Sequence, residues 1–264
     1  MPTQFNMSKK QRNSTIIKVA VTATLIIILL FSGSYTCSKK DNLKSIGLCY
    51  NYPLSTYKEN NKIKIYDIKD TILIFYYSDY VVYRLSATRQ FETGEKLKGT
   101  EPYFIYNKKN DFGFLFNSLN DSSQGIKYPL DSFLANRGLK GKDFDIPVDS
   151  LWSLTEVVKI KKNSLLEKYT SLKQGDETTI DSIYYYYSKD MNKIEYSFSK
   201  KLDSIRAMKL YKIRLLYNQR ISVSNEVLLP KRELSFEIIT ENVYDPRKII
   251  EFIKKFENGL MNKR

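Results

Sequence analysis

Short runs in which apolar and polar residues alternate predict that β-strands make up much of this chain. Lys209–Tyr217, for example, places Tyr211, Ile213 and Leu215 on one face and charged residues on the other, which is the period of a half-buried strand. Strands with one polar face are typical of antiparallel sheets that are covered on one side. The strands expected on this basis are Lys62–Ile68, Thr71–Tyr77, Tyr80–Ser86, Tyr103–Asn107, Phe112–Phe116, a strand from Ile183, one through Ile194–Phe198, Lys209–Tyr217 and one through Leu234–Ile238.

Two strand pairings follow from the same pattern. The polar turn 108–111 separates Tyr103–Asn107 from Phe112–Phe116, so these two strands form a hairpin. Three phenylalanines fall on one face of its second strand, at positions 112, 114 and 116. The strand at Lys209–Tyr217 is expected to pair with the strand at Leu234 after the intervening loop.

Apolar residues three and four positions apart predict three helices in the middle of the chain. The first has the strongest boundaries, because Pro129 suits a helix start and Gly138 suits the residue after its end. Asp149 or Ser150 can cap the second, and a third is expected at Ser164–Leu172. The apolar positions that carry the first two predictions are Leu130, Phe133 and Leu134, and Leu151, Leu154 and Val158.

The last helix is predicted by signals at both of its ends. Asp245 stands at the N-cap, Pro246 at the first helical position and Gly259 where a helix often ends. Its apolar stripe is expected to cover the sheet, although its basic side would also suit a membrane surface. The stripe consists of Ile249, Phe252, Ile253, Phe256 and Leu260.

These elements together predict an α+β fold: a predominantly antiparallel twisted sheet with helices packed on one face and a C-terminal amphipathic helix. Residues 62–264 would form a single α+β domain. Residues 37–61 are polar, and Pro53 interrupts their periodicity, so a tether followed by an irregular segment is expected there.

The first 36 residues have the order of an export signal. Basic residues precede the apolar run Val19–Phe31, and small residues and Cys37 follow it. The run is shorter than the roughly 20 apolar residues of a comfortable bilayer crossing, so a cleaved signal peptide is favoured over a permanent membrane anchor, which stays open.

The end of this leader, Ser34-Tyr35-Thr36-Cys37, resembles the signal of bacterial lipoproteins. The resemblance implies that Cys37 becomes the lipid-bearing N-terminus after cleavage, and Ser38 suits transport to an outer membrane. The protein would then be membrane-anchored in the cell envelope, facing the periplasm or the exterior. The alternative role of Cys37 is a disulfide with Cys49, since an exported protein meets oxidising conditions.

The charge of the chain changes the choice of partners. It has 43 Lys and Arg against 29 Asp and Glu, a formal net charge of +14. An exported protein rarely meets nucleic acid, so no nucleic-acid partner is expected. Anionic lipid, an acidic glycan or another envelope protein are the candidate partners, although scattered basic residues also serve solubility alone.

Histidine is absent from the chain, and this excludes several classes of enzyme. Ser-His-Asp and Cys-His mechanisms need an imidazole, as do histidine-ligated zinc, iron and haem sites. Whether the protein is an enzyme stays uncertain, with a non-enzymatic role favoured, and no cofactor is expected. The chemistry that remains for an enzyme is that of carboxylate pairs, Lys or Tyr bases, Ser-Lys arrangements or an oxygen-ligated metal.

Two groups of residues are candidate sites. Tyr184, Tyr185, Tyr186 and Tyr187 put two aromatic rings on each side of one strand, and such rings can stack on sugars. Asp143, Asp145 and Asp149 are weak candidates for a cation site, because their spacing lacks the glycine and the final glutamate of a calcium loop; no metal is expected.

The function favoured by the sequence is that of an envelope lipoprotein with a non-catalytic binding or assembly role. One alternative is an extracytoplasmic carboxylate-based enzyme acting on glycans, and another is a carrier of lipid or other apolar ligand. A pocket with two or more converging acids would favour the enzyme. An apolar groove or an exposed tyrosine face would favour binding, and a large internal cavity would favour the carrier.

Overall fold

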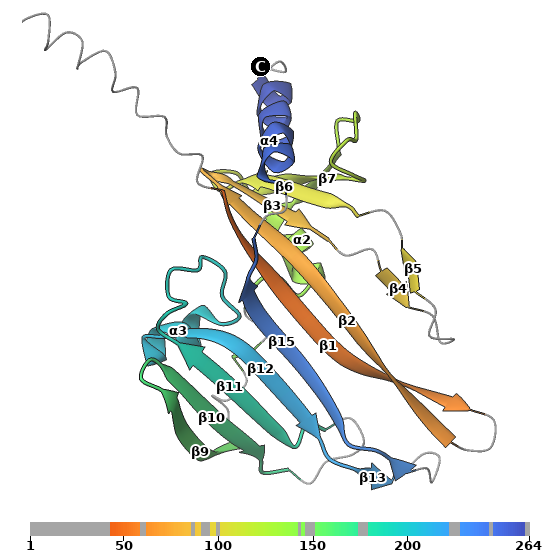
Figure 1. Ribbon diagram of the computed structural model, residues 1–264, viewed down its shortest axis with the longest axis vertical. Coiled ribbons are helices and arrows are strands. Elements are labelled where there is room, and N and C mark those ends of the chain that lie inside the picture. The colour runs from red at the N-terminus through yellow and green to blue at the C-terminus, as the bar shows by residue number, and fades with distance from the viewer. Residues whose placement is uncertain are drawn as a thin grey trace, which may run out of the picture. The chain divides into compact units, whose positions relative to one another are not determined.

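The computed structural model shows a domain built on one large antiparallel sheet. Eleven strands lie in the order β8-β7-β6-β3-β2-β1-β15-β12-β11-β10-β9 (Figure 1). Two small two-stranded sheets, β4–β5 and β13–β14, complete the strands of the described residues. The structure describes residues 43–58, 62–85, 88–90, 96–98, 101–141, 144–145, 151–173, 179–221, 228–242 and 245–261.

The strands and helices have the following bounds. The first eight strands are β1 (Lys44–Lys58), β2 (Lys62–Tyr77), β3 (Tyr80–Arg84), β4 (Thr88–Gln90), β5 (Lys96–Lys98), β6 (Tyr103–Asn107), β7 (Phe112–Phe116) and β8 (Ile126–Pro129). The others are β9 (Trp152–Lys161), β10 (Ser164–Ser171), β11 (Ser182–Ser188), β12 (Lys209–Tyr217), β13 (Arg220–Ile221), β14 (Leu228–Leu229) and β15 (Arg232–Thr240). The helices are α2 (Leu130–Asn136), α3 (Lys200–Arg206) and α4 (Pro246–Met261).

The middle of the sheet is a long hairpin of β1 and β2. β2 contains the predicted strands Lys62–Ile68 and Thr71–Tyr77, whereas β1 forms where a tether and an irregular segment were expected, so that expectation is wrong for residues 44–58. β1 pairs with β2 along its whole length, from Lys44 opposite Tyr76 to Lys58 opposite Lys62. β15 pairs only with the part of β1 that runs from residue 46 to residue 51. Pro53 therefore lies where the described strands contact β1 on one side only, and a proline without an N–H is tolerated there.

The sheet has a buried cluster on each face. Along β3, Val81 and Tyr83 belong to the larger cluster, whereas Val82 between them belongs to the smaller one. The larger cluster, here called the main core, includes Phe133 of α2 and Leu202 of α3 as well as buried residues of β1, β2, β10, β11 and β12. The smaller cluster, the α4 core, consists of Phe75, Val82, Tyr103, Ile105, Phe116, Ile249, Phe252, Ile253 and Phe256.

Helix α4 forms where its capping signals predict it and covers one end of the sheet beside β3, β6 and β7 (Figure 1). Asp245 accepts a 3.4 Å hydrogen bond from the backbone N–H of Lys248, as an N-cap residue does. The helix continues past Gly259 to Met261, so that glycine does not end it. The buried residues of the stripe face the sheet, which is the packing expected from their spacing.

The expected α+β fold with helices packed on one face is wrong, although the antiparallel sheet itself is confirmed. The described residues are dominated by strands, and the three helices divide between the two faces of the sheet. Two of the three predicted middle helices are strands, since Trp152–Lys161 forms β9 and Ser164–Ser171 forms β10. Four β-branched residues of β9, Thr155, Val157, Val158 and Ile160, favour the extended state.

The strand predicted through Ile194–Phe198 is also wrong, because this segment is irregular backbone. Tyr196 and Phe198 are buried in the main core and Ile194 packs against it, but the segment pairs with no strand of the described residues. The Lys209 ammonium donates to the Tyr196 carbonyl at 3.0 Å, and the Ser197 hydroxyl donates to Asp203 at 2.7 Å. Gly141, at φ +70°, packs so closely on the Ser197 carbonyl that an added Cβ would lie 2.3 Å from it.

Candidate functional site

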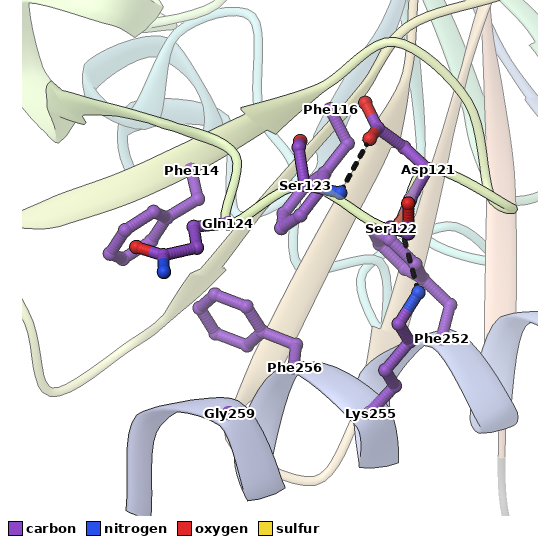
Figure 2. Close-up of a pocket in the computed structure, with 10 residues that line it drawn as sticks. All are labelled: Phe114, Phe116, Asp121, Ser122, Ser123, Gln124, Phe252, Lys255, Phe256 and Gly259. Atoms are coloured by element: carbon purple, nitrogen blue, oxygen red, sulfur yellow. Dashed lines mark hydrogen bonds between the residues drawn. The ribbon is translucent and has the colours of Figure 1, made fainter. Parts of the chain in front are cut away.

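A pocket of about 320 Å³ lies between α4, strand β7 and the loop that leads from β7 to β8 (Figure 2). Its volume is at the lower end of the range for small-molecule sites. Each of the three segments contributes side chains, and a large part of the lining is aromatic. The lining residues are Phe114, Phe116, Asp121, Ser122, Ser123, Gln124, Phe252, Lys255, Phe256 and Gly259.

Four phenylalanine rings form the apolar wall of the pocket. Phe114 and Phe116 come from β7, and Phe252 and Phe256 come from α4. Phe116 meets Phe252 edge to face with 5.2 Å between ring centroids, and Phe114 meets Phe256 in the same way at 5.3 Å. Edge-to-face contacts of this kind hold rings in defined orientations. The wall is therefore a fixed apolar surface shared by the helix and the sheet.

The loop across the pocket is held by one carboxylate. Asp121 accepts hydrogen bonds from the backbone N–H groups of Asn117 at 3.0 Å and Ser123 at 2.8 Å. These hydrogen bonds lower the pKa of Asp121 below its ordinary value, and the nearby Lys255 contributes in the same direction. Because the pKa is lower in the folded state, this stabilisation is present above the ordinary pKa and is lost as the pH falls through the lowered value.

Glycine lets this loop lie close to the aromatic wall. Gly125 has φ +69°, and a Cβ added to it would lie 2.8 Å from the ring of Phe116. A residue with a side chain would be strained in this left-handed backbone conformation and would also clash with the ring. At the opposite side of the pocket, an added Cβ on Gly259 would have no atom within 4 Å. The last turn of α4 therefore leaves open space beside the phenylalanines.

The lining of the pocket does not contain the pair of carboxylates that glycoside hydrolysis uses. Asp121 is the sole acidic residue among the lining residues, and its carboxylate is already engaged by the loop. Two-carboxylate hydrolysis needs a second acid at a set separation, and no other lining residue supplies one. The apolar wall with polar groups along one side is the arrangement of a site for an apolar or amphiphilic ligand.

The four candidate tyrosines of β11 divide between the two faces of the sheet. Tyr185 and Tyr187 lie in the main core and are 0% exposed, so an external ligand does not reach them. The Tyr185 hydroxyl donates to the Phe144 carbonyl at 2.8 Å. Burial also raises the pKa of both hydroxyls well above the ordinary tyrosine value.

Tyr184 and Tyr186 lie half-buried on the other face of β11, where basic side chains lie over their rings. The Arg214 guanidinium lies 5.3 Å from the Tyr184 ring centroid, and the Lys212 ammonium lies 5.9 Å from that of Tyr186. Arg214 also donates to the Tyr186 hydroxyl at 3.0 Å. A sugar would have to displace these cations in order to stack, and sugar binding by this pair stays a prediction.

Three of the remaining candidate residues, Cys37, Asp143 and Asp149, lie outside the described residues. The Asp145 carboxylate accepts a hydrogen bond from the Ser199 hydroxyl, and within the described ranges no three His, Cys, Asp or Glu side chains are grouped so that they could hold a metal ion. Cys49 is half-buried and has no disulfide partner within the described residues; its sulfur lies 3.5 Å from the Thr71 hydroxyl.

The sequence pattern did not predict the pocket, although it predicted that the phenylalanines of its wall fall in two pairs. The shared face of Phe114 and Phe116 is apparent from the strand period, and Phe252 and Phe256 belong to the predicted helix stripe. No local pattern indicates that these two pairs meet.

No helix within the described ranges is long and apolar enough to cross a membrane.

Comparisons with known proteins add little to this picture. No protein-family model matches the chain, and no curated protein matches it. One solved structure that matches is the ywiB protein from Bacillus subtilis, which is 9% identical over 76% of this chain and 94% of that chain, with a TM-score of 0.16.

Proposed function

We propose that this protein is a non-catalytic binding protein of the cell envelope that holds an apolar ligand in the pocket under α4. The observation that carries the proposal is the wall of four phenylalanines around about 320 Å³ of open volume. Buried aromatic side chains normally fill such space themselves, because protein interiors are close-packed. A pocket that stays open between a helix and a sheet is therefore a candidate binding site.

The polar groups of the pocket support binding over catalysis. Asp121 organises the loop instead of facing a second acid, and the Lys255 ammonium hydrogen-bonds to the backbone carbonyl of Asp121. The complete absence of histidine removes the commonest general base. The lining residues therefore supply apolar contact and a few hydrogen-bonding groups for orientation.

The proposed location comes from the leader of the chain. A lipid on Cys37 would tether the domain to a membrane, and residue 43 is only six positions further along the chain. Leu43 packs against the α4 core. An extended chain of six residues spans at most about 20 Å. The tether would therefore keep the end of the domain that carries the pocket close to the membrane, where apolar ligands concentrate.

Lipidation of Cys37 has a direct test. Mass spectrometry of the native N-terminus should find a chain that begins at Cys37 and carries acyl groups, because the leader resembles a lipoprotein signal. Replacing Cys37 by alanine should abolish this species, whereas Cys49→Ala should not change it. An intact 1–36 segment, or an unmodified Cys37 joined to Cys49, would contradict the proposal.

Ligand binding in the pocket has a test that uses the open side of α4. The full chain in its native membrane would be exposed to an alkyl probe that carries a photoreactive diazirine. Labelled peptides should contain the lining phenylalanines of β7 and α4. In Gly259→Trp the indole would occupy the open space, and labelling of these peptides should fall by roughly tenfold or more, a loss of about 1.4 kcal/mol in binding.

The matched control is Asn258→Trp, which places the same side chain on the exposed neighbouring position of α4. It should leave the labelling unchanged. Equal labelling of the Gly259→Trp and Asn258→Trp proteins, with both folded, would show that the probe does not enter the pocket.

A further inference from the structure

The pocket has a chemically distinct end, where the ammonium of Lys255 lies at its rim. Lys255 projects from α4 toward the loop and donates to the backbone carbonyl of Asp121 at 2.9 Å. Figure 2 shows this contact beside Ser122, whereas the Phe114 and Phe256 rings lie toward the other side of the pocket. Lys255 therefore supplies a cationic group at one end of a largely apolar lining, next to the Phe252 ring.

The Lys255 ammonium has capacity for a further acceptor. An ammonium group has three N–H donors, and the contact to the Asp121 carbonyl uses one of them. No salt bridge joins Lys255 to a carboxylate of the described ranges. The Asp121 carboxylate, which is nearby, is turned to the backbone N–H groups of its own loop. An anionic oxygen entering at the rim would find a charged donor already positioned there.

Neutral polar groups of the loop also line the pocket, with Ser122 beside Lys255 and Gln124 beside the Phe114 ring (Figure 2). Ser122, Ser123 and Gln124 follow one another in the loop and all contribute to the lining. Ser122, Ser123 and Gln124 are exposed, so a polar head group could stay in contact with water while these groups hydrogen-bond to it. Such a lining suits an amphiphile, with its apolar chain inside the pocket and its charged head group at the mouth.

We infer that the ligand is a single alkyl chain that ends in an anionic oxygen group, a carboxylate or a phosphate. This inference rests on the proposed function and adds the ligand class to it. The chain lies among the four phenylalanines, and its head group binds the Lys255 ammonium. About 320 Å³ holds roughly eleven groups the size of water, at about 30 Å³ each, which matches a twelve-carbon carboxylate whose head carbon stays at the rim.

The affinity of the ligand should rise with the length of its alkyl chain and then reach a plateau. Each methylene that enters the pocket removes apolar area from water and should strengthen binding by about threefold to fourfold. The gain should stop when the pocket is full, at roughly twelve carbons. A ligand that only partitions into a bilayer would instead gain with every added carbon.

The head group is tested by competition against a photoreactive twelve-carbon carboxylate bound to the full chain. Dodecanoate and dodecyl phosphate should compete best, dodecanol less well, and dodecylammonium least, because the last places a cation against Lys255. The advantage of dodecanoate over dodecanol should be about fivefold, the scale of one partly exposed ion pair. Lys255→Gln should remove this advantage, so that dodecanoate and dodecanol compete equally.

The matched control is Lys254→Gln, which removes the adjacent exposed charge of α4, one that is not part of the lining. It should leave the order of competitors unchanged, and both variants should show the melting temperature of the parent protein. Preference for dodecyl phosphate over dodecanoate would point to a lipid-derived head group, and the reverse to a free fatty acid; both agree with the inference.

The remaining outcomes separate the inference from the proposed function. If dodecanol competes as well as dodecanoate in the parent protein, the anionic head group is wrong while the apolar pocket stands. If vesicles of an anionic two-chain phospholipid compete and the single-chain compounds do not, the single-chain ligand is wrong. If no compound competes and Gly259→Trp does not reduce labelling, the proposed function fails as well.

Discussion

Replacing Phe252 by alanine should lower the free energy of unfolding by about 3–5 kcal/mol, as truncation of a buried phenylalanine does. Phe252 is 4% exposed, and its ring meets the rings of Tyr103 and Phe116 with centroid distances of 5.9 and 5.2 Å. The loss removes contacts between α4 and both β6 and β7. Because domains are commonly stable by only about 5–15 kcal/mol, this single change would threaten the fold.

Urea unfolding followed by circular dichroism measures this effect. Glu251→Ala is the control, because it changes the adjacent exposed position of the same helix and should shift stability by no more than about 0.5 kcal/mol. Similar midpoints for the two variants would mean that α4 does not hold the sheet. The helix stripe would then be free for another role, such as contact with a membrane surface.

Replacing Arg206 by alanine should cost about 3 kcal/mol, because it leaves a buried carboxylate without its partner. Glu167 of β10 is 1% exposed. Its carboxylate accepts from the Arg206 guanidinium at 2.6 Å and from the Tyr169 hydroxyl at 3.0 Å. The Arg206 side chain is 34% exposed, which places the expected cost at the lower end of the range for buried pairs.

A second substitution distinguishes charge from packing. Adding Glu167→Gln to Arg206→Ala should recover much of the loss, because a neutral amide can still accept from Tyr169 without a buried charge. Lys201→Ala, at an exposed position of the same helix, serves as the control and should cost little. If the double variant is no more stable than Arg206→Ala, the guanidinium stabilises the domain through packing rather than by pairing the charge.

Elements bounded by strong local signals were predictable from the sequence. The hairpin strands Tyr103–Asn107 and Phe112–Phe116 form with the expected bounds and pair across the expected turn. The predicted pairing of the Lys209 and Leu234 strands is confirmed as β12 with β15. Helices α2 and α4 begin next to Pro129 and at Pro246. In each case a turn, a cap or a proline restricts the backbone locally, and no distant contact is needed.

Elements without such signals were decided by tertiary pairing. The apolar residues of Trp152–Lys161 satisfy a helical spacing as well as an extended one, and pairing with β10 selects the strand. The sequence of β1 is too polar to predict a strand. It forms a central strand because it pairs with β2 on one side and with β15 on the other. Local preference is a weak prior, and backbone pairing with burial overrides it.

The candidate site shows the same division. The sequence by itself determined that Phe114 and Phe116 share a face, that Phe252 and Phe256 share a stripe, and that β11 sends two tyrosines to each side. Only the tertiary structure decided which tyrosines are buried, since that depends on which face meets the main core. It also decided that the two phenylalanine pairs meet at a pocket. More than 130 residues separate Asp121 from its partner Lys255, and a contact over that separation in sequence depends on how the sheet and α4 pack, which no local pattern encodes.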